Sequence, residues 1–168
     1  YKDEFDDLPD NEYIFGHEDG QKTILSPYRI LINHYNKYQH EYSDLFYNNL
    51  DIPEFWYVYP EWDNGKIMYH GEKKASISFK EPVIKRYVHK VEWLNYKTDY
   101  YDLYGLKFFT EYYDQTIGLL LTSFYNDDKK EILSIHHRNE VFFVNELNKA
   151  KMFYSYKEFV QYVESFIE

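Results

Sequence analysis

The sequence contains no cysteine, and among its 168 residues it has only six glycines and two methionines. Without cysteine there is no disulfide framework and no thiol chemistry, which fits the cytosol. The few glycines form neither a phosphate-binding loop nor a dinucleotide-type motif, and neither G-x-S-x-G nor H-E-x-x-H occurs. The sequence therefore predicts no active site within this chain and no cofactor.

Basic residues are also scarce, because 19 Lys and Arg stand against 29 Asp and Glu, for a net charge of −10. Phosphate backbones and anionic lipids repel such a chain, so nucleic acid is excluded as a primary partner. No apolar run approaches the ~18 residues of a membrane span, and no signal peptide is recognisable. We expect a cytoplasmic protein, peripheral to the membrane at most. Because the chain opens on Tyr1 rather than Met, we expect it to be a piece of a longer protein.

Aromatic residues are abundant, with 21 Tyr, 13 Phe and 3 Trp. Such side chains favour β-strands, and the length suits a single domain over residues 1–168. Turn residues recur at short intervals and separate strand-like runs, which is typical of an antiparallel meander. The predicted strands are 66–70, 75–79, 85–94, 98–104, 106–113, 118–125, 131–137 and 140–145.

Two helices are predicted to flank the meander. Ser26-Pro27 is a typical helix start, and the apolar spacing that follows predicts a short helix at about 27–36. Ser155 and Glu158 form a capping-box pattern ahead of an amphipathic helix at about 155–167. The fold class is thus α+β, mainly β. Residues 1–20 are an acidic lead-in whose carboxylates do not match the spacing of a Ca²⁺ loop.

The sequence DYYDLYGLKFFTEYYD, residues 99–114, predicts a hairpin that turns near Tyr104-Gly105. Because alternate residues of a strand face opposite sides, its second strand places aromatic rings on both faces. One face receives Leu106, Phe108 and Tyr112, and the other receives Phe109 and Tyr113. One helix cannot cover both faces of a wide sheet. Either some aromatic surface is left for a partner or neighbouring domain, or the Tyr hydroxyls simply reach water.

Three short motifs suggest chemistry but have simpler explanations. His136 and His137 are adjacent in a predicted strand and point to opposite faces, so they do not fit one metal ion. Glu92-Trp93 and Glu61-Trp62 each pair a carboxylate for sugar hydroxyls with a ring for stacking. Each is only a dipeptide, and a packed Trp is the more common explanation.

The order of several segments resembles a known family, although each segment alone is a weak motif. The matching elements are Ser26-Pro27-Tyr28, Pro53-Glu54-Phe55-Trp56, Lys85-Arg86-Tyr87-Val88 with Val91-Glu92-Trp93, and Asp99 to Gly105. In this order they resemble the N-terminal region of the accessory Sec system glycosylation chaperone. That family is the non-catalytic subunit of the O-GlcNAc transferase that modifies serine-rich repeat adhesins in streptococci and staphylococci. The resemblance spans about residues 26–167.

The resemblance implies a β-sheet extension domain, inserted in a GT-B-type glycosyltransferase-like chain whose Rossmann halves lie outside this sequence. It implies pairing with the catalytic O-GlcNAc transferase subunit, help in holding the Ser-rich adhesin polypeptide, and no transferase activity. Self-association through sheet edges is a further expectation. The candidate partner or acceptor surface comprises Trp56, Trp62, Trp93, Tyr101, Phe109, Tyr113 and Tyr125.

Two alternatives remain open at this point. The first is the equivalent sheet domain of a catalytic enzyme, either the O-GlcNAc transferase subunit itself or a poly(glycerol-phosphate) glucosyltransferase. The second is a free-standing carbohydrate-binding module that uses exposed Trp56, Trp62 or Tyr side chains.

Overall fold

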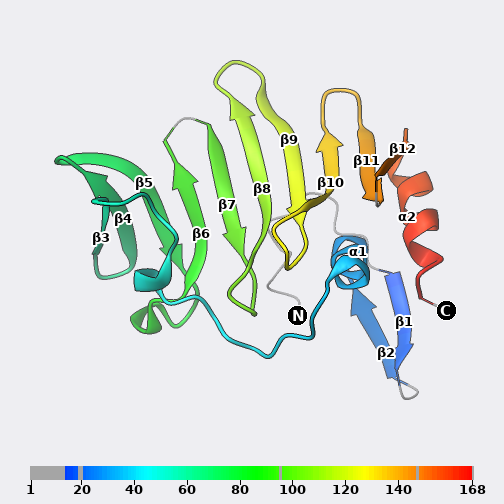
Figure 1. Ribbon diagram of the computed structural model, residues 1–168, viewed down its shortest axis with the longest axis horizontal. Coiled ribbons are helices and arrows are strands. Elements are labelled where there is room, and N and C mark those ends of the chain that lie inside the picture. The colour runs from blue at the N-terminus through cyan, green and yellow to red at the C-terminus, as the bar shows by residue number, and fades with distance from the viewer. Residues whose placement is uncertain (1–13, 19–20, 95, 147, 168) are drawn as a thin grey trace. The chain divides into compact units, whose positions relative to one another are not determined.

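The computed structural model of the chain describes residues 14–18, 21–94, 96–146 and 148–167. Within these ranges there are two α-helices, α1 (Pro27–Tyr35) and α2 (Tyr156–Glu164), and two short 3₁₀ turns, η1 (Tyr47–Asn49) and η2 (Val83–Lys85) (Figure 1). The strands are β1 (Ile14–Glu18), β2 (Gln21–Leu25), β3 (Tyr57–Pro60), β4 (Asn64–Tyr69), β5 (Glu72–Phe79), β6 (Val88–Trp93), β7 (Lys97–Tyr101), β8 (Lys107–Asp114), β9 (Gly118–Tyr125), β10 (Glu131–His136), β11 (Val141–Glu146) and β12 (Lys149–Phe153).

Strands β3 to β12 form one ten-stranded sheet in which they follow one another in chain order, and β1 pairs with β2 in a separate hairpin. The predicted antiparallel meander with a short N-terminal helix and a C-terminal helix is therefore confirmed. The acidic residues 3–10 of the predicted lead-in lie outside the described residues, while residues 14–18 of that lead-in form β1.

The sequence pattern does not predict β3 and β12, which are the two ends of the large sheet. β3 closes on Pro60, whose missing N–H is tolerated at an edge. β12 carries Lys149 and Lys151, and lysine has low strand propensity but is common on sheet edges. The predicted strand 85–94 is also too long at its start, because η2 and a left-handed Arg86 (φ 57°) precede β6.

The described residues group into two compact units. Unit 1 combines the residues up to Tyr38 with those from Ser123 onward, and unit 2 is Gln39–Thr122. All three Trp residues of the sequence belong to unit 2, so tryptophan fluorescence reports on that unit alone.

Unit 1 contains both helices, and each begins with the predicted cap. The Ser26 hydroxyl accepts a hydrogen bond from the Tyr28 N–H, with Pro27 in the first turn. The Ser155 hydroxyl accepts from the Glu158 N–H at 3.2 Å. The Glu158 carboxylate in turn accepts from the Tyr154 N–H, one residue earlier than a capping box requires. Both predicted helix starts are thus confirmed by side-chain contacts.

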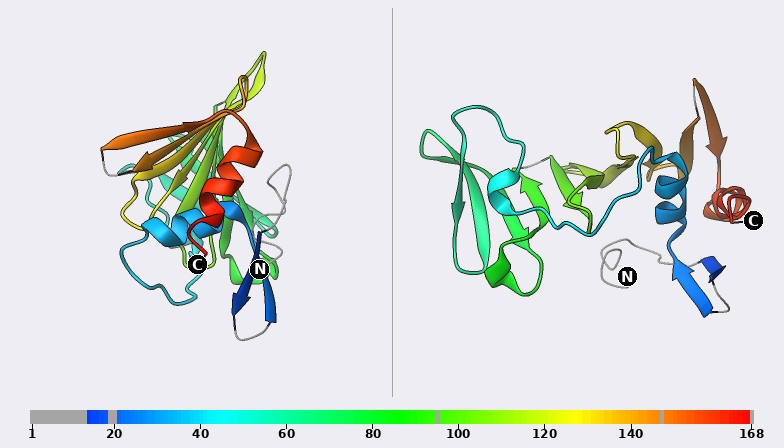
Figure 2. Two further views of the ribbon diagram at one scale, coloured as in Figure 1. Left: turned by 90° about the vertical axis from the view of Figure 1, so that its right-hand side faces the viewer. Right: turned by 60° about the horizontal axis from the view of Figure 1, so that its bottom comes forward.

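The core of unit 1 is built on Phe159 of α2, which is fully buried. Its ring stacks on Phe142 of β11, with centroids 4.9 Å apart, and lies 5.8 Å from Tyr28 of α1. Tyr28 in turn stacks on Phe124 of β9 at 4.7 Å. The helices α1 and α2 lie side by side, as Figure 2 shows. Aromatic stacking therefore joins both helices to the strands of this unit.

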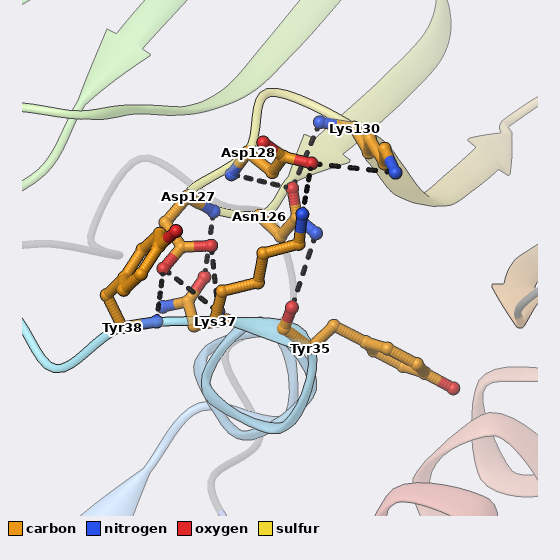
Figure 3. Close-up of polar contacts among 8 residues, drawn as sticks. Tyr35, Lys37, Tyr38, Asn126, Asp127, Asp128 and Lys130 are labelled. Atoms are coloured by element: carbon orange, nitrogen blue, oxygen red, sulfur yellow. Dashed lines mark hydrogen bonds and ion pairs between the residues drawn. The ribbon is translucent and has the colours of Figure 1, made fainter.

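A polar cluster holds the end of α1 against the turn between β9 and β10 (Figure 3). The Asp127 carboxylate accepts hydrogen bonds from the backbone N–H groups of Lys37, at 2.9 and 3.0 Å, and Tyr38, at 2.8 Å. The Asn126 side chain donates to the carbonyl of Tyr35, while its own oxygen accepts two N–H groups of the turn. The last carbonyl groups of a helix lack intrahelical partners, and Asn126 satisfies that of Tyr35, while Asp127 satisfies two N–H groups just beyond the helix.

We expect Asp127→Ala to lower the free energy of unfolding of unit 1 by about 1–2 kcal/mol, because it removes charge-assisted acceptors for backbone donors. Urea titration followed by far-UV circular dichroism measures the change. Asp128→Ala is the matched control, since within the described part of the chain its carboxylate forms exposed ion pairs with Lys37 and Lys130. Equal shifts in the urea midpoint for both variants would contradict this account.

In unit 2 the hairpin at residues 99–114 has the turn predicted for it. The Asp102 carboxylate accepts hydrogen bonds from the N–H groups of Tyr104 and Leu106, at 2.9 and 3.0 Å. Gly105 has a φ of 74°, and a Cβ there would lie 2.5 Å from the carbonyl oxygen of Ser43. Both the left-handed backbone and the close approach require glycine. The turn fixes β8 beside β7, where the candidate site lies.

Neither helix among the described residues is long and apolar enough to cross a membrane. Within the same ranges, no three or more His, Cys, Asp or Glu side chains gather in a way that could hold a metal ion.

Candidate functional site

The antiparallel register of β3 to β8 sorts the side chains of unit 2 onto two faces, because directly paired residues point the same way. On one face, a row of paired residues runs across Val58, Ile67, Ala75 and Trp93. A neighbouring row on that face includes Ile77 and Val91, which are fully buried. The segment before β3 covers this face with partly or fully buried side chains, namely Leu45, Tyr47, Leu50, Ile52 and Trp56.

The opposite face of the same strands is polar. Its central row contains one residue from each of β3 to β8, namely Tyr59, Lys66, Ser76, Glu92, Thr98 and Glu111. Tyr59 is the one aromatic residue in this row. The adjacent row comprises Ser78, Lys90, Tyr100 and Phe109. Across β4 to β7 the sheet is therefore apolar on one side only. At β8 both sides are buried, since Phe108 is 3% and Phe109 1% exposed.

A pocket of about 410 Å³ opens on this polar face, and we call it the β6–β8 pocket. Buried Thr98 and Tyr100 of β7 form its floor. Lys90 and Glu92 of β6 line one side, and Tyr113 of β8 lines the other. The rest of the lining comes from the strand ends and the flanking turns, namely Trp93, Tyr96, Lys97, Asp114 and Gln115. Pockets of this size are typical of small-molecule sites.

Both signs of charge occur in the lining. The Lys90 ammonium lies 3.5 Å from the Glu92 carboxylate. At the rim, the Asp114 carboxylate accepts hydrogen bonds from the N–H groups of Ile117 and Thr116, which hold its pKa below the usual value. Lys97 also borders the pocket, but its ammonium lies 3.8 Å from the Asp99 carboxylate on the opposite face. These groups together can donate and accept hydrogen bonds around a ligand.

Tyr113 contributes a hydroxyl that stays protonated at neutral and mildly alkaline pH. Partial burial, together with the negative charge and hydrogen bond of Glu111, raises the pKa of Tyr113 to about 12. The nearby Glu92 carboxylate acts in the same direction. Glu111 is only 5% exposed, so the Tyr113 hydroxyl contacts a buried carboxylate. Tyr113 thus offers a neutral polar group to the pocket.

Behind the pocket, on the apolar face, Asp99 is the centre of a buried hydrogen-bond network. Its carboxylate accepts from the Trp93 indole N–H at 2.8 Å and from the Thr110 hydroxyl at 2.7 Å. The Lys97 ammonium lies 3.8 Å away. Asp99 is 3% exposed, so these contacts replace the water that its charge would otherwise require. The network ties together the three strands that carry the pocket.

The structure separates the seven residues that the sequence suggests as a partner or acceptor surface. Trp62 is 78% and Tyr113 39% exposed, so both rings are accessible. Phe109, at 1% exposure, stacks on Tyr100 with centroids 4.1 Å apart, which makes it a core residue and not part of a surface. Burial and the charge of Asp99 raise the pKa of Tyr101, which packs against the apolar cluster. Tyr125 belongs to unit 1 and is partly buried.

The remaining two Trp residues are partly buried and close together. Trp56 stacks on Tyr69 at 5.5 Å and lies 6.4 Å from Trp93. Both pack against the apolar cluster of unit 2. Both residues of the Glu92-Trp93 dipeptide border the pocket, and the Trp93 indole N–H donates to Asp99. Glu61 likewise contacts Lys66, at 2.6 Å, while Trp62 is exposed.

Sequence reasoning did not find Lys90, Tyr96, Tyr100 and Asp114 as pocket residues. Each lies in a different strand or turn, and the register of three strands brings them together. The alternation of Lys90 and Glu92 along β6 was the one available signal, since both point to the same side of a strand.

Comparison with known proteins gives consistent matches. The family model described as the GtfB middle domain matches residues 56–154, which is more than half of the chain. A relative from Streptococcus agalactiae, named UDP-N-acetylglucosamine–peptide N-acetylglucosaminyltransferase stabilizing protein GtfB, is 27% identical over 79% of this chain and 30% of its own length. The protein of the same name from Streptococcus parasanguinis is 28% identical over 66% of this chain and 26% of its own length.

Among solved structures, the fold resembles a chain of the GtfA/B complex bound to UDP and GlcNAc, with a TM-score of 0.74 and 20% identity. The match covers 89% of this chain and 34% of that one. At this level of identity the likeness concerns the fold alone. The chain spans less than a third of the length of the two curated relatives described above.

Proposed function

The chain belongs to the GtfB middle domain family, and from this premise we propose that it is a non-catalytic interaction domain of a glycosylation chaperone. In this role it pairs with the catalytic O-GlcNAc transferase subunit, stabilises it and helps to hold the Ser-rich adhesin polypeptide during O-glycosylation in the cytoplasm. The observation that carries the proposal is the family match over residues 56–154, together with relatives that are named as stabilising proteins of an N-acetylglucosaminyltransferase.

A group of exposed aromatic side chains at one edge of the sheet supports a protein partner. Tyr57 and Tyr59 of β3 point to the same side and are 48% and 57% exposed, and Trp62 follows at 78%. We call these three residues the β3 aromatic patch. β3 is the last strand of the sheet order, so its outer backbone groups face no further strand of the described sheet. Exposed Tyr and Trp rings next to a sheet edge are typical of interaction surfaces.

The experiment mixes the 168-residue chain with the purified catalytic subunit and measures co-elution on a sizing column and the melting temperature of the catalytic subunit. We expect a complex and a higher melting temperature, because binding to the folded state stabilises it. Exchanging Tyr59 and Trp62 for serine should weaken the complex about tenfold or more, since buried aromatic anchors dominate interface energies.

Tyr154→Ser is the matched control, because Tyr154 is 67% exposed but belongs to unit 1. If the chain neither co-elutes with the catalytic subunit nor binds a Ser-rich repeat peptide, the proposed function is wrong. If the Tyr154 variant loses binding while the β3 variant keeps it, the function stands but the assigned surface does not.

A further inference from the structure

We propose that the β6–β8 pocket is a binding site for a neutral pyranose sugar. The pocket has a volume of about 410 Å³, which exceeds the space that a single pyranose ring occupies and falls in the usual range for small-ligand sites. It lies within unit 2, and residues on three consecutive strands line it. The inference goes beyond the proposed pairing with a transferase, because it concerns a site that needs no partner.

The charges of the lining favour a neutral ligand. Lys90 brings positive charge to the pocket, and Glu92 and Asp114 bring negative charge. The Lys97 ammonium, by contrast, is directed to Asp99 on the opposite face. An anion would meet the two carboxylates, and a cation would meet the Lys90 ammonium, so a ligand of either sign encounters repulsion. A polyhydroxylated neutral molecule meets no like charge. Its hydroxyl groups can donate to the carboxylates and accept from the Lys90 ammonium.

The polar floor and the rings at the rim fit the two kinds of surface that a pyranose presents. The buried side chains of Thr98 and Tyr100 give the floor hydroxyl groups, and Tyr113 adds a hydroxyl that remains protonated. Tyr96, which is 53% exposed, and Tyr113 place partly exposed rings at the opening. Such rings provide apolar area for the C–H face of a sugar, while the hydroxyl edge points to the polar groups.

The first test titrates the chain with neutral and charged sugars and follows backbone amide shifts by NMR. The neutral probes are glucose, galactose and N-acetylglucosamine, and the charged probes are glucosamine and glucuronate. We expect saturable shifts at pocket residues with at least one neutral sugar. Both charged sugars should bind at least about tenfold more weakly than that sugar. The inference is overturned if no neutral sugar gives saturable shifts, if the shifts lie elsewhere, or if a charged sugar binds as tightly.

Variants then test the assigned residues. Glu92→Gln keeps the shape of the side chain but removes the charge, and Tyr96→Ala removes a ring that is mostly exposed. Each should weaken sugar binding about 3- to 10-fold, which corresponds to one lost polar or ring contact. Tyr42→Ala is the control, since Tyr42 is 60% exposed and lies outside the pocket lining. Tryptophan fluorescence verifies that each variant is folded. Unchanged binding in both pocket variants would refute the site.

The sugar can come from a free saccharide or from a glycosylated polypeptide, and the same titration separates these sources. Its arms are the methyl glycoside, the same sugar attached to a serine peptide, and the unmodified serine peptide. Tighter binding of either sugar-bearing probe than of the bare peptide supports the inference and names the source. If the bare peptide binds the pocket as well as the glycosylated one, the site recognises polypeptide and the inference is wrong.

Discussion

Phe109→Ala is expected to lower the free energy of unfolding of unit 2 by about 3–5 kcal/mol, because it deletes a buried aromatic ring and leaves a cavity. Phe109 is 1% exposed, stacks on Tyr100 at 4.1 Å and meets Phe108 edge-on at 4.7 Å. Guanidinium titration followed by tryptophan fluorescence measures the change in unit 2 alone, since all three Trp residues lie there.

Phe55→Ala is the matched control, because the same ring is removed from a side chain that is 82% exposed. We expect its midpoint to differ little from that of the parent chain. A small effect of Phe109→Ala, comparable to the control, would mean that the ring does not pack in the core and belongs to a surface after all. The comparison thus decides directly between the interior position seen in the structure and the surface role that the sequence suggested.

Asp99→Ala should destabilise unit 2 by a similar amount, about 3–5 kcal/mol, since it removes a buried charged acceptor and leaves its donors without partners. The donors are the Trp93 indole and the Thr110 hydroxyl, with the Lys97 ammonium nearby. The same fluorescence titration measures the loss. The emission of folded Trp93 should also change, because its indole loses a charged neighbour.

Asp99→Asn provides the graded comparison, because the amide keeps the shape of the side chain and one oxygen acceptor but loses the charge. We expect a smaller loss than for alanine, while Glu92→Gln on the opposite face should change the stability least, since the Glu92 side chain is 52% exposed. Equal stability of the alanine variant and the parent chain would show that Asp99 does not hold the three strands together.

The two proposed surfaces of unit 2 share one side of the sheet. Tyr59 of the β3 aromatic patch and Glu92 of the β6–β8 pocket belong to the same row of paired residues, with Lys66 and Ser76 between them. The covered apolar face provides the rigid support for both, because its core side chains come from the same strands. The variants proposed above alter one surface at a time, so partner binding and sugar binding can be measured separately.

The sequence by itself determined the local structure well where a short stretch carries its own signal. Ser26-Pro27 and Ser155 specify helix starts through contacts two or three residues away. Gly105 and the Asp102 side chain specify the turn of the 99–114 hairpin. Strand alternation also placed Phe108 and Phe109 on opposite faces correctly, since the two-residue period of a strand is a property of its backbone.

Only the tertiary structure decided which of those faces is covered and what each side chain meets. Alternation cannot say whether Phe109 or Tyr113, on the same face, is buried, because the answer depends on neighbouring strands and on the segment packed against them. Nor could it place Asp99 between Trp93 and Thr110, or gather Lys90, Tyr100 and Tyr113 around one pocket. These contacts depend on inter-strand register, which is set by turns and bulges along several strands together, and a shift of one residue would reverse every face.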